Sequence, residues 1–188
     1  MKSASAEDQL VAVAQEFLAT IKDLTPGKQL ELKLNKEHAP GTKYYDELAR
    51  LSKIGLQEGW LANIEIDGPH YRRSRLRSPS EDLSWFSITA VYMDSKKPTL
   101  DPLHGQYHAH PYGEVNMVIP VSGEQPELEG LNGWRHSGWT CPGPGSHHFP
   151  AVRGGSLIAL FFLPAGRISY NAKPDDPQPR DPGSSLGL

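Results

Sequence analysis

A disulfide framework and a membrane span are both missing from this sequence. Its only cysteine is Cys141, so no disulfide can form within the chain, and a lone thiol is typical of a reducing cytosol. No apolar run approaches the roughly 20 residues of a membrane-spanning helix. The N-terminus mixes acidic and polar residues with its apolar ones and does not resemble a secretory signal. We expect a cytoplasmic protein that does not bind membranes.

An excess of charge of one sign is missing as well. The 188 residues include 19 Lys and Arg against 22 Asp and Glu, which gives a formal net charge of -3. A balance this even indicates no general binding to nucleic acid. The sequence also lacks a glycine signature for dinucleotides, so neither nicotinamide nor flavin is expected as a cofactor. The length fits one domain with a sizeable core.

Helical periodicity is confined to the first third of the chain. Apolar residues recur at helical spacing over residues 5–24, where a serine followed by an aspartate resembles a capping box. A second helix is predicted over residues 42–57, with Gly59 as its C-terminal stop. We interpret residues 1–59 as a helical extension that serves packing or oligomerisation.

After Gly59 the pattern changes to short β-prone runs separated by Gly, Pro, Asp and Ser. The runs are LANIEI, HYRRSRLR, WFSITAVYM, EVNMVIPV, ELEGL, WRHSGWT, HHFPAV and GGSLIALFFL. Many short strands without helices between them favour an antiparallel sandwich or small barrel, which we place at residues 60–172. Residues 173–188 are rich in Pro, Asp and Gly and are predicted to form an extended or disordered arm over a neighbouring subunit. Arm and extension together favour a homo-oligomer, a dimer or higher.

The stretch HAHPYGE carries an unusual number of ionisable groups next to a strand-like run. Alternate side chains of a strand share a face, so His108 and His110 point the same way, and Glu114 has the same parity. Two neutral imidazoles and a carboxylate suit divalent Fe, Mn, Zn, Ni or Co. Burying an unpaired carboxylate is costly, and a divalent cation would compensate it. A metal-free polar cluster is the alternative.

A second histidine segment, CPGPGSHHFPAV, is a tight turn that runs into a strand. Its neighbours His147 and His148 face opposite sides, so only one of them can join the site. His104 has the same parity as His108 and is a candidate for a substitute ligand or a proton carrier, with a surface position as the alternative.

The run HYRRSRLR places four arginines within six residues. By parity Arg73, Arg75 and Arg77 share one face with Tyr71, while Arg72 lies on the other. The simplest interpretation directs the three outward and leaves Arg72 facing inward, and a bulge would exchange the two faces. A guanidinium near a pocket binds a carboxylate in a bidentate pair, so Arg72, Arg73 and Arg75 are candidates for binding an anionic substrate.

The pattern HxHxxxE followed by PGxxH is similar to the two motifs of the cupin superfamily, over about residues 60–170. The resemblance implies a mainly β protein, a cupin-type antiparallel barrel (double-stranded β-helix or jelly roll) behind the N-terminal helical extension. It selects His148 over His147 and implies four metal ligands: His108, His110, Glu114 and His148. The glycine that ends the first motif comes late here, at Gly123, and Val152 replaces the asparagine that ends the second. These departures concern strand boundaries and leave the ligand set unchanged.

The whole chain resembles the 4-hydroxylaminobenzoate lyases of bacterial nitrobenzoate breakdown, through YRRSRL, HGQYHAHPYGEVNMVIP, GWTCPGPGSHHFPAV and LFFLPAGRISY. The resemblance implies metal-assisted conversion of 4-hydroxylaminobenzoate to 3,4-dihydroxybenzoate (protocatechuate) with release of ammonia. For this small aromatic carboxylate the arginines would bind the carboxylate, and Tyr107 and Tyr112 would stack on the ring. Glu114 or His104 would carry protons.

Two other functions use the same residues. An Fe(II)-dependent cupin dioxygenase acting on an aromatic acid would keep the ligands and consume oxygen. A metal-free, ligand-binding cupin would bind without turnover. Oxygen uptake distinguishes the first alternative from the lyase, and elemental analysis distinguishes the second.

Overall fold

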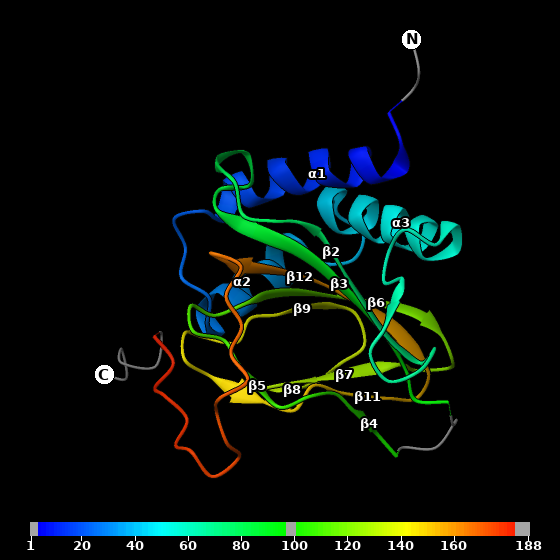
Figure 1. Cartoon of the computed structure of the whole chain (residues 1–188). Helices are drawn as coiled ribbons and strands as arrows, with labels where there is room; N and C mark the ends of the chain where they lie inside the picture. The colour runs from blue at the N-terminus through cyan, green and yellow to red at the C-terminus, as the bar shows by residue number, and fades with distance from the viewer. Residues whose placement is uncertain (1–3, 97–100, 183–188) are drawn as a thin grey trace.

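The computed structural model of the chain describes residues 4–96 and 101–182. Three helices precede the β-structure: α1 (Ala6–Ile21), α2 (Lys28–Glu37) and α3 (Lys43–Glu58). Figure 1 shows α1 and α3 side by side across one face of the larger sheet. Within the described residues, none of the helices is long and apolar enough to cross a membrane.

The predicted helices at residues 5–24 and 42–57 are confirmed as α1 and α3. The Oγ of Ser5 accepts a hydrogen bond from the backbone N–H of Asp8 at 3.1 Å, which caps α1. Gly59 ends α3 in the left-handed region at φ 80°, where glycine is favoured. The prediction missed α2, because only three of its ten residues are buried and the apolar stripe is too short to stand out.

In the described part of the chain, twelve strands form three antiparallel sheets. They are β1 (Ile64–Glu65), β2 (Tyr71–Arg77), β3 (Phe86–Asp94), β4 (Leu103–His104), β5 (His108–Ala109), β6 (Val115–Ser122), β7 (Glu127–Gly130), β8 (Gly133–Arg135), β9 (Gly138–Thr140), β10 (His147–His148), β11 (Ala151–Arg153) and β12 (Ser156–Pro164), with a short 3-10 helix at Glu81–Leu83. The six-stranded sheet has the order β1-β2-β3-β12-β6-β9, the four-stranded sheet β4-β11-β7-β8, and β5 pairs with β10. In Figure 1 the four-stranded sheet faces the six-stranded sheet from the side away from the helices. The predicted mainly β, antiparallel architecture behind N-terminal helices is confirmed.

The six-stranded sheet is buried on both faces, and this decides what the barrel interior contains. One face packs against the helices through residues that include Ile88, Leu160 and Phe162. The other packs against the four-stranded sheet through a smaller cluster that includes Met93 and Phe161. The apolar, even-numbered side of WFSITAVYM therefore faces the helices. Its more polar, odd-numbered side faces the barrel interior.

Helix α2 closes the open edge of β9, the last strand of the large sheet. The side-chain amide of Asn35 pairs with both main-chain groups of Trp139: the N–H of Trp139 donates to Oδ1 at 2.9 Å, and Nδ2 donates to the carbonyl at 2.8 Å. The Trp139 indole N–H donates to the carbonyl of His38 at 2.7 Å. An exposed strand edge would otherwise be open to pairing with another chain.

We expect the substitution Asn35→Leu to destabilise the protein by about 1–3 kcal/mol, because it leaves two main-chain groups at a partly buried edge without their partners. The exposed neighbour Lys36 provides the control, and Lys36→Ala should change stability by less than about 0.5 kcal/mol. Urea unfolding of the three proteins measures the difference. Equal stability of the two variants would contradict the edge-closing role of α2.

Candidate metal centre and adjoining cavity

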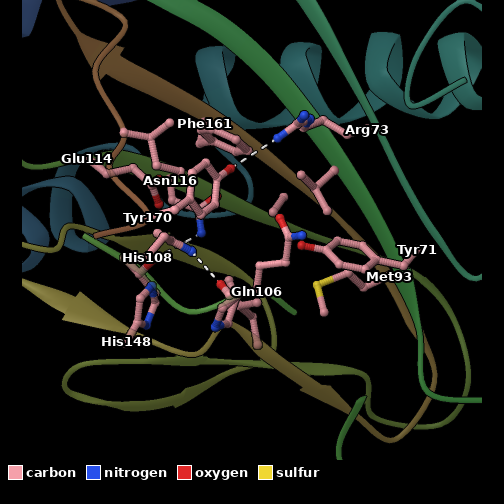
Figure 2. A pocket seen from close by; sticks show the side chains of 16 residues that line it. Tyr71, Arg73, Met93, Gln106, His108, Glu114, Asn116, His148, Phe161 and Tyr170 are labelled. Carbon is pink, nitrogen blue, oxygen red and sulfur yellow. Dashed lines mark hydrogen bonds between the residues drawn. The ribbon is translucent and has the colours of Figure 1, made fainter. Parts of the chain in front are cut away.

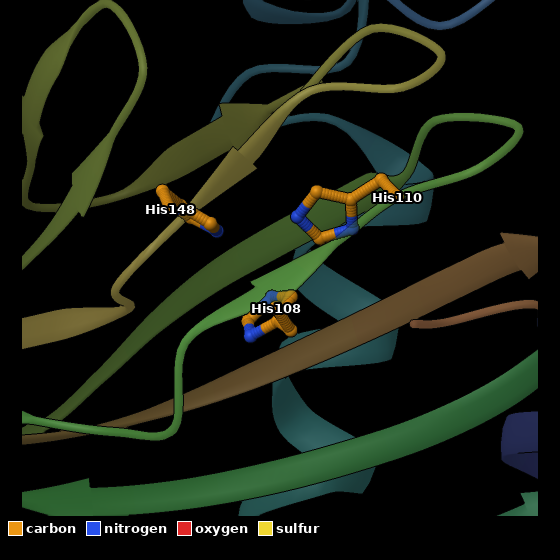
Figure 3. A group of neighbouring side chains, drawn as sticks. All are labelled: His108, His110 and His148. Atoms are coloured by element: carbon orange, nitrogen blue, oxygen red, sulfur yellow. The ribbon is translucent and has the colours of Figure 1, made fainter. Parts of the chain in front are cut away.

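Three histidines meet where β5 pairs with β10. In this antiparallel pair His108 lies opposite His148, and Ala109 lies opposite His147. His110 follows directly, and its backbone N–H donates to the carbonyl of Ser146 at 2.8 Å. Figure 3 shows the three imidazoles directed toward one another. One ring nitrogen from each of His108, His110 and His148 lies within 4.8 Å of the other two, a spacing that could hold a metal ion.

The hydrogen bonds of these rings leave nitrogen atoms free to bind a metal. His110 has no solvent exposure, and neither of its ring nitrogens forms a hydrogen bond to the described residues. Each unpaired polar atom in the interior costs about 1–3 kcal/mol unless something binds it. Nδ1 of His108 donates to the carbonyl of Gln106 at 2.9 Å, which orients the ring and leaves Nε2 as a metal ligand.

Burial keeps the three histidines neutral. Desolvation lowers the pKa of His148 to about 3 and lowers the pKa of His108. The pKa of His110 is lowered well below its usual value, by desolvation first and then by His108 and His148. Metal binding requires the neutral imidazole, so the histidines hold the competent protonation state at neutral pH.

Glu114, the fourth predicted ligand, borders this group without belonging to its tight cluster. It is buried, and its Oε2 lies 3.4 Å from Nδ1 of His110. Desolvation by burial raises the pKa of Glu114 to about 8. A divalent ion next to it would compensate the carboxylate. The donor set of three imidazoles and one carboxylate therefore fits a divalent transition metal.

A cavity of about 60 Å³ adjoins the histidines inside the barrel. Figure 2 shows the side chains that surround it. One end carries ionisable and amide groups, and the walls are apolar or aromatic. The lining residues include Tyr71, Arg73, Gln106, Glu114, Asn116, Thr140, Phe161 and Tyr170.

The arginine run forms β2 with its two sides exchanged relative to the prediction. Arg73 lines the cavity and lies opposite Val91, another cavity residue. Arg72 lies on the other face, with its guanidinium carbon 4.7 Å from the centre of the Tyr92 ring. The expectation that Arg72 faces the barrel interior is therefore wrong, and Arg73 lines the cavity while remaining exposed. The sequence does not show which face of the sheet the helices cover. The helices cover the apolar face, and Arg72 lies on that face.

The remaining arginines lie farther along β2. Arg75 is exposed and donates to the carbonyl of Gly166 at 3.2 Å. A register shift between Arg75 and Arg77 turns Arg77 toward α1, where it pairs with Glu7. The bulge considered as an alternative in this strand therefore exists. It lies beyond Arg73 and does not change the direction of the Arg73 side chain.

Three predicted residues lie away from the cavity lining. The hydroxyl of Tyr107 hydrogen-bonds Nδ1 of His147, and the Tyr107 ring packs on Phe149 with centroids 4.6 Å apart. Tyr112 is 54% exposed in the turn after β5. His104 is exposed in β4, with its ring 6.1 Å from that of Phe149.

The aromatic side chains that do line the cavity are Tyr71, Phe161 and Tyr170, which the sequence analysis did not select. Asn116 was also missed, although it has the parity of Glu114 and is a polar residue inside the strand-like run EVNMVIPV. The parity and polarity of Asn116 could therefore have identified it from the sequence. Tyr170 gives no such signal, because only the path of the chain after β12 brings it to the cavity.

We expect Glu114→Gln to change how the stability of the metal-free protein depends on pH. The pKa of Glu114 is about 8 in the folded state, against 4.5 as its reference value, so between these values the unfolded state loses the proton that the folded state keeps. Relative to the variant, the wild-type free energy of unfolding should fall by about 1.4 kcal/mol per unit as pH rises through this window. Urea unfolding in the presence of a chelator measures it, and parallel pH profiles would contradict it.

The sequence has named relatives. The family model described as PnbB, 4-hydroxylaminobenzoate lyase, matches residues 12–170. A curated 4-hydroxylaminobenzoate lyase from Nocardioides sp. (strain LMS-CY) is 54% identical over 170 residues, which cover 90% of this chain and 98% of the relative. One from Pseudomonas putida is 52% identical over 168 residues, covering 87% and 95%. A crystal structure from work on DMSP lyases overlaps 93% of this chain and 97% of its own, at 14% identity and a TM-score of 0.41. On its sequence matches, the chain belongs to the 4-hydroxylaminobenzoate lyase family.

Proposed function

We propose that this protein converts 4-hydroxylaminobenzoate to 3,4-dihydroxybenzoate with release of ammonia, assisted by a divalent transition metal at His108, His110, His148 and Glu114. The observation that carries the proposal is the buried histidine group with unpaired ring nitrogens beside a cavity that also contains an arginine. The names of the relatives support the substrate. The reaction consumes one water in net terms and needs no external oxidant.

The cavity has polar groups at two ends, as a para-substituted benzoate requires. Figure 2 shows Arg73 and His148 at opposite ends of the group of lining side chains. The carboxylate and the nitrogen of the substrate lie at opposite ends of its ring. We therefore assign the carboxylate to Arg73, in a charge-assisted pair, and the hydroxylamino group to the end with the histidines.

The mouth of the cavity must open to admit an aromatic ring. A volume of about 60 Å³ holds only a few water molecules. At present the guanidinium of Arg73 donates to the hydroxyl of Tyr170 at 3.2 Å, and Tyr170 is 48% exposed. Outward rotation of Tyr170 would make room and release Arg73, and the substrate carboxylate would then replace the tyrosine hydroxyl. The apolar wall around Phe161 would contact the ring.

Two side chains are placed to act on the hydroxylamino group. Asn116 is buried and donates through Nδ2 to Oγ1 of Thr140 at 3.1 Å, which leaves its Oδ1 unpaired in the cavity wall. Oδ1 can accept a hydrogen bond from the N–H or O–H of the substrate. Glu114 would be ionised as a metal ligand, and its second carboxylate oxygen could accept a proton from the attacking water. A bound divalent metal would supply Lewis acidity at this end.

We expect protein incubated with 4-hydroxylaminobenzoate under anaerobic conditions to release ammonia and protocatechuate in equal amounts. Treatment with a chelator should abolish turnover, and addition of Fe(II), Mn(II), Zn(II), Ni(II) or Co(II) should identify the ion that restores it. His110→Gln should lower activity by more than about tenfold through loss of metal. The control His136→Gln, at a histidine whose Nδ1 faces the carbonyl of Pro126, should retain activity. Product formed only with oxygen would indicate a dioxygenase, and binding without product a ligand-binding cupin.

We expect Arg73→Gln to lower kcat/KM for 4-hydroxylaminobenzoate by about tenfold or more, mainly through KM, because the carboxylate loses its cationic partner. The loss should be much smaller with phenylhydroxylamine, which has no carboxylate. The control Arg167→Gln removes the same charge from an exposed position in the segment after β12 and should leave both substrates unaffected. Equal losses for the two substrates in Arg73→Gln would contradict the assignment.

A further inference from the structure

The three histidines are held by the smallest sheet of the molecule. Strands β5 and β10 have two residues each and pair only with one another among the named strands. An isolated two-stranded ribbon is at best marginally stable in water. Something else must fix it, because a ligand group that shifts by an ångström loses metal affinity.

The β5 edge of this ribbon is closed by the segment after β12. The N–H of Ala109 donates to the carbonyl of Ser169 at 2.7 Å, and the N–H of Ser169 donates back to the carbonyl of Ala109 at 3.0 Å. Ala109 separates His108 from His110. The two hydrogen bonds therefore fix the backbone between two of the three histidines.

The β10 edge is closed by the same part of the chain, nine residues later. The N–H of His147 donates to Oε1 of Gln178 at 3.2 Å, and Nε2 of Gln178 donates to the carbonyl of His147. The amide thus pairs with β10 as a further strand would. The carbonyl of Pro177 also lies 3.3 Å from Nε2 of His147. His147 precedes His148 and lies opposite Ala109 in the ribbon. The hydrogen bonds to Ser169 and Gln178 therefore close the two outer edges of the ribbon at the same pair of residues.

The far end of this segment is attached to the helical layer. Oδ2 of Asp181 accepts a hydrogen bond from the backbone N–H of Lys28, the first residue of α2, at 2.9 Å. A carboxylate is favourable at a helix N-terminus. Figure 1 shows the segment, in orange to red, passing from β12 beside β5 and down one side of the barrel. Residues 183–188 of the predicted arm lie outside the described residues.

We propose that residues 169–181 clamp the β5–β10 ribbon and that Gln178 is a positioning residue for His148 and the metal. The proposal deepens the proposed function and rests on its metal site. It assigns to the arm a role within its own chain, whereas the sequence predicted an arm over a neighbouring subunit. Gln178 touches no reacting group and acts through the backbone of His147.

The test compares Gln178→Ala with Gln57→Ala, which removes the same side chain from an exposed position on α3. In metal-free protein, amide hydrogen exchange of His110, whose N–H bonds Ser146 across the ribbon, should accelerate in Gln178→Ala and not in Gln57→Ala. Co(II) affinity, measured by competition with a chelator, should fall by about tenfold or more. The unfolding temperature should match that of the control.

A second variant keeps the comparison decisive. Gln178→Glu retains an acceptor for the N–H of His147 but places a carboxylate oxygen against its carbonyl, so its exchange rate and Co(II) affinity should differ from wild type at least as much as those of Gln178→Ala. Unchanged exchange and affinity in Gln178→Ala would overturn the proposal. So would a lower unfolding temperature with faster exchange throughout the barrel, because Gln178 would then be a general stabiliser. If wild type binds no Co(II), the metal site fails, and the exchange comparison still decides the clamp.

Discussion

Neither ring nitrogen of His110 forms a hydrogen bond within the part of the chain that the structure describes, although the side chain is completely buried. The carboxyl group of Glu114 lies beside it in the same dry environment, with a raised pKa. Burying these groups without a partner lowers the free energy of unfolding by several times the contribution of an ordinary hydrogen bond. A divalent cation would provide a partner for both groups. The arrangement of the barrel follows from this constraint: a short ribbon carries the histidines, and the C-terminal segment closes both of its edges.

The helices make a polar barrel interior possible. Because α1 and α3 cover the apolar face of the large sheet, most of the hydrophobic core lies outside the barrel. The inner face can then hold Arg73, Asn116 and Thr140 beside a smaller apolar cluster. A barrel without this outer layer would have to fill its interior with the residues that now contact the helices. In this sense the N-terminal extension is part of what creates the cavity.

The sequence predicted well what depends on local geometry. The two-residue period placed His108 and His110 on one side, and the resemblance to the cupin motifs selected His148, so three side chains that meet in the structure could be named from two distant segments. The face of β2 was predicted wrongly, because parity shows which arginines share a side and not which layer covers it. Tyr107 was chosen as an aromatic partner that would stack on the substrate ring, whereas Tyr170 reaches the cavity through a chain path that no local pattern encodes.

The central claim is that His108, His110 and His148 bind a divalent metal together with Glu114. X-ray absorption spectroscopy of the purified protein, after elemental analysis has identified the ion, tests it most directly. The account predicts one metal per chain, coordinated by three imidazoles and a carboxylate, with the imidazole scattering reduced in His148→Gln. Protein that contains no metal and acquires none, or a metal whose coordination shows no imidazole, would contradict the account.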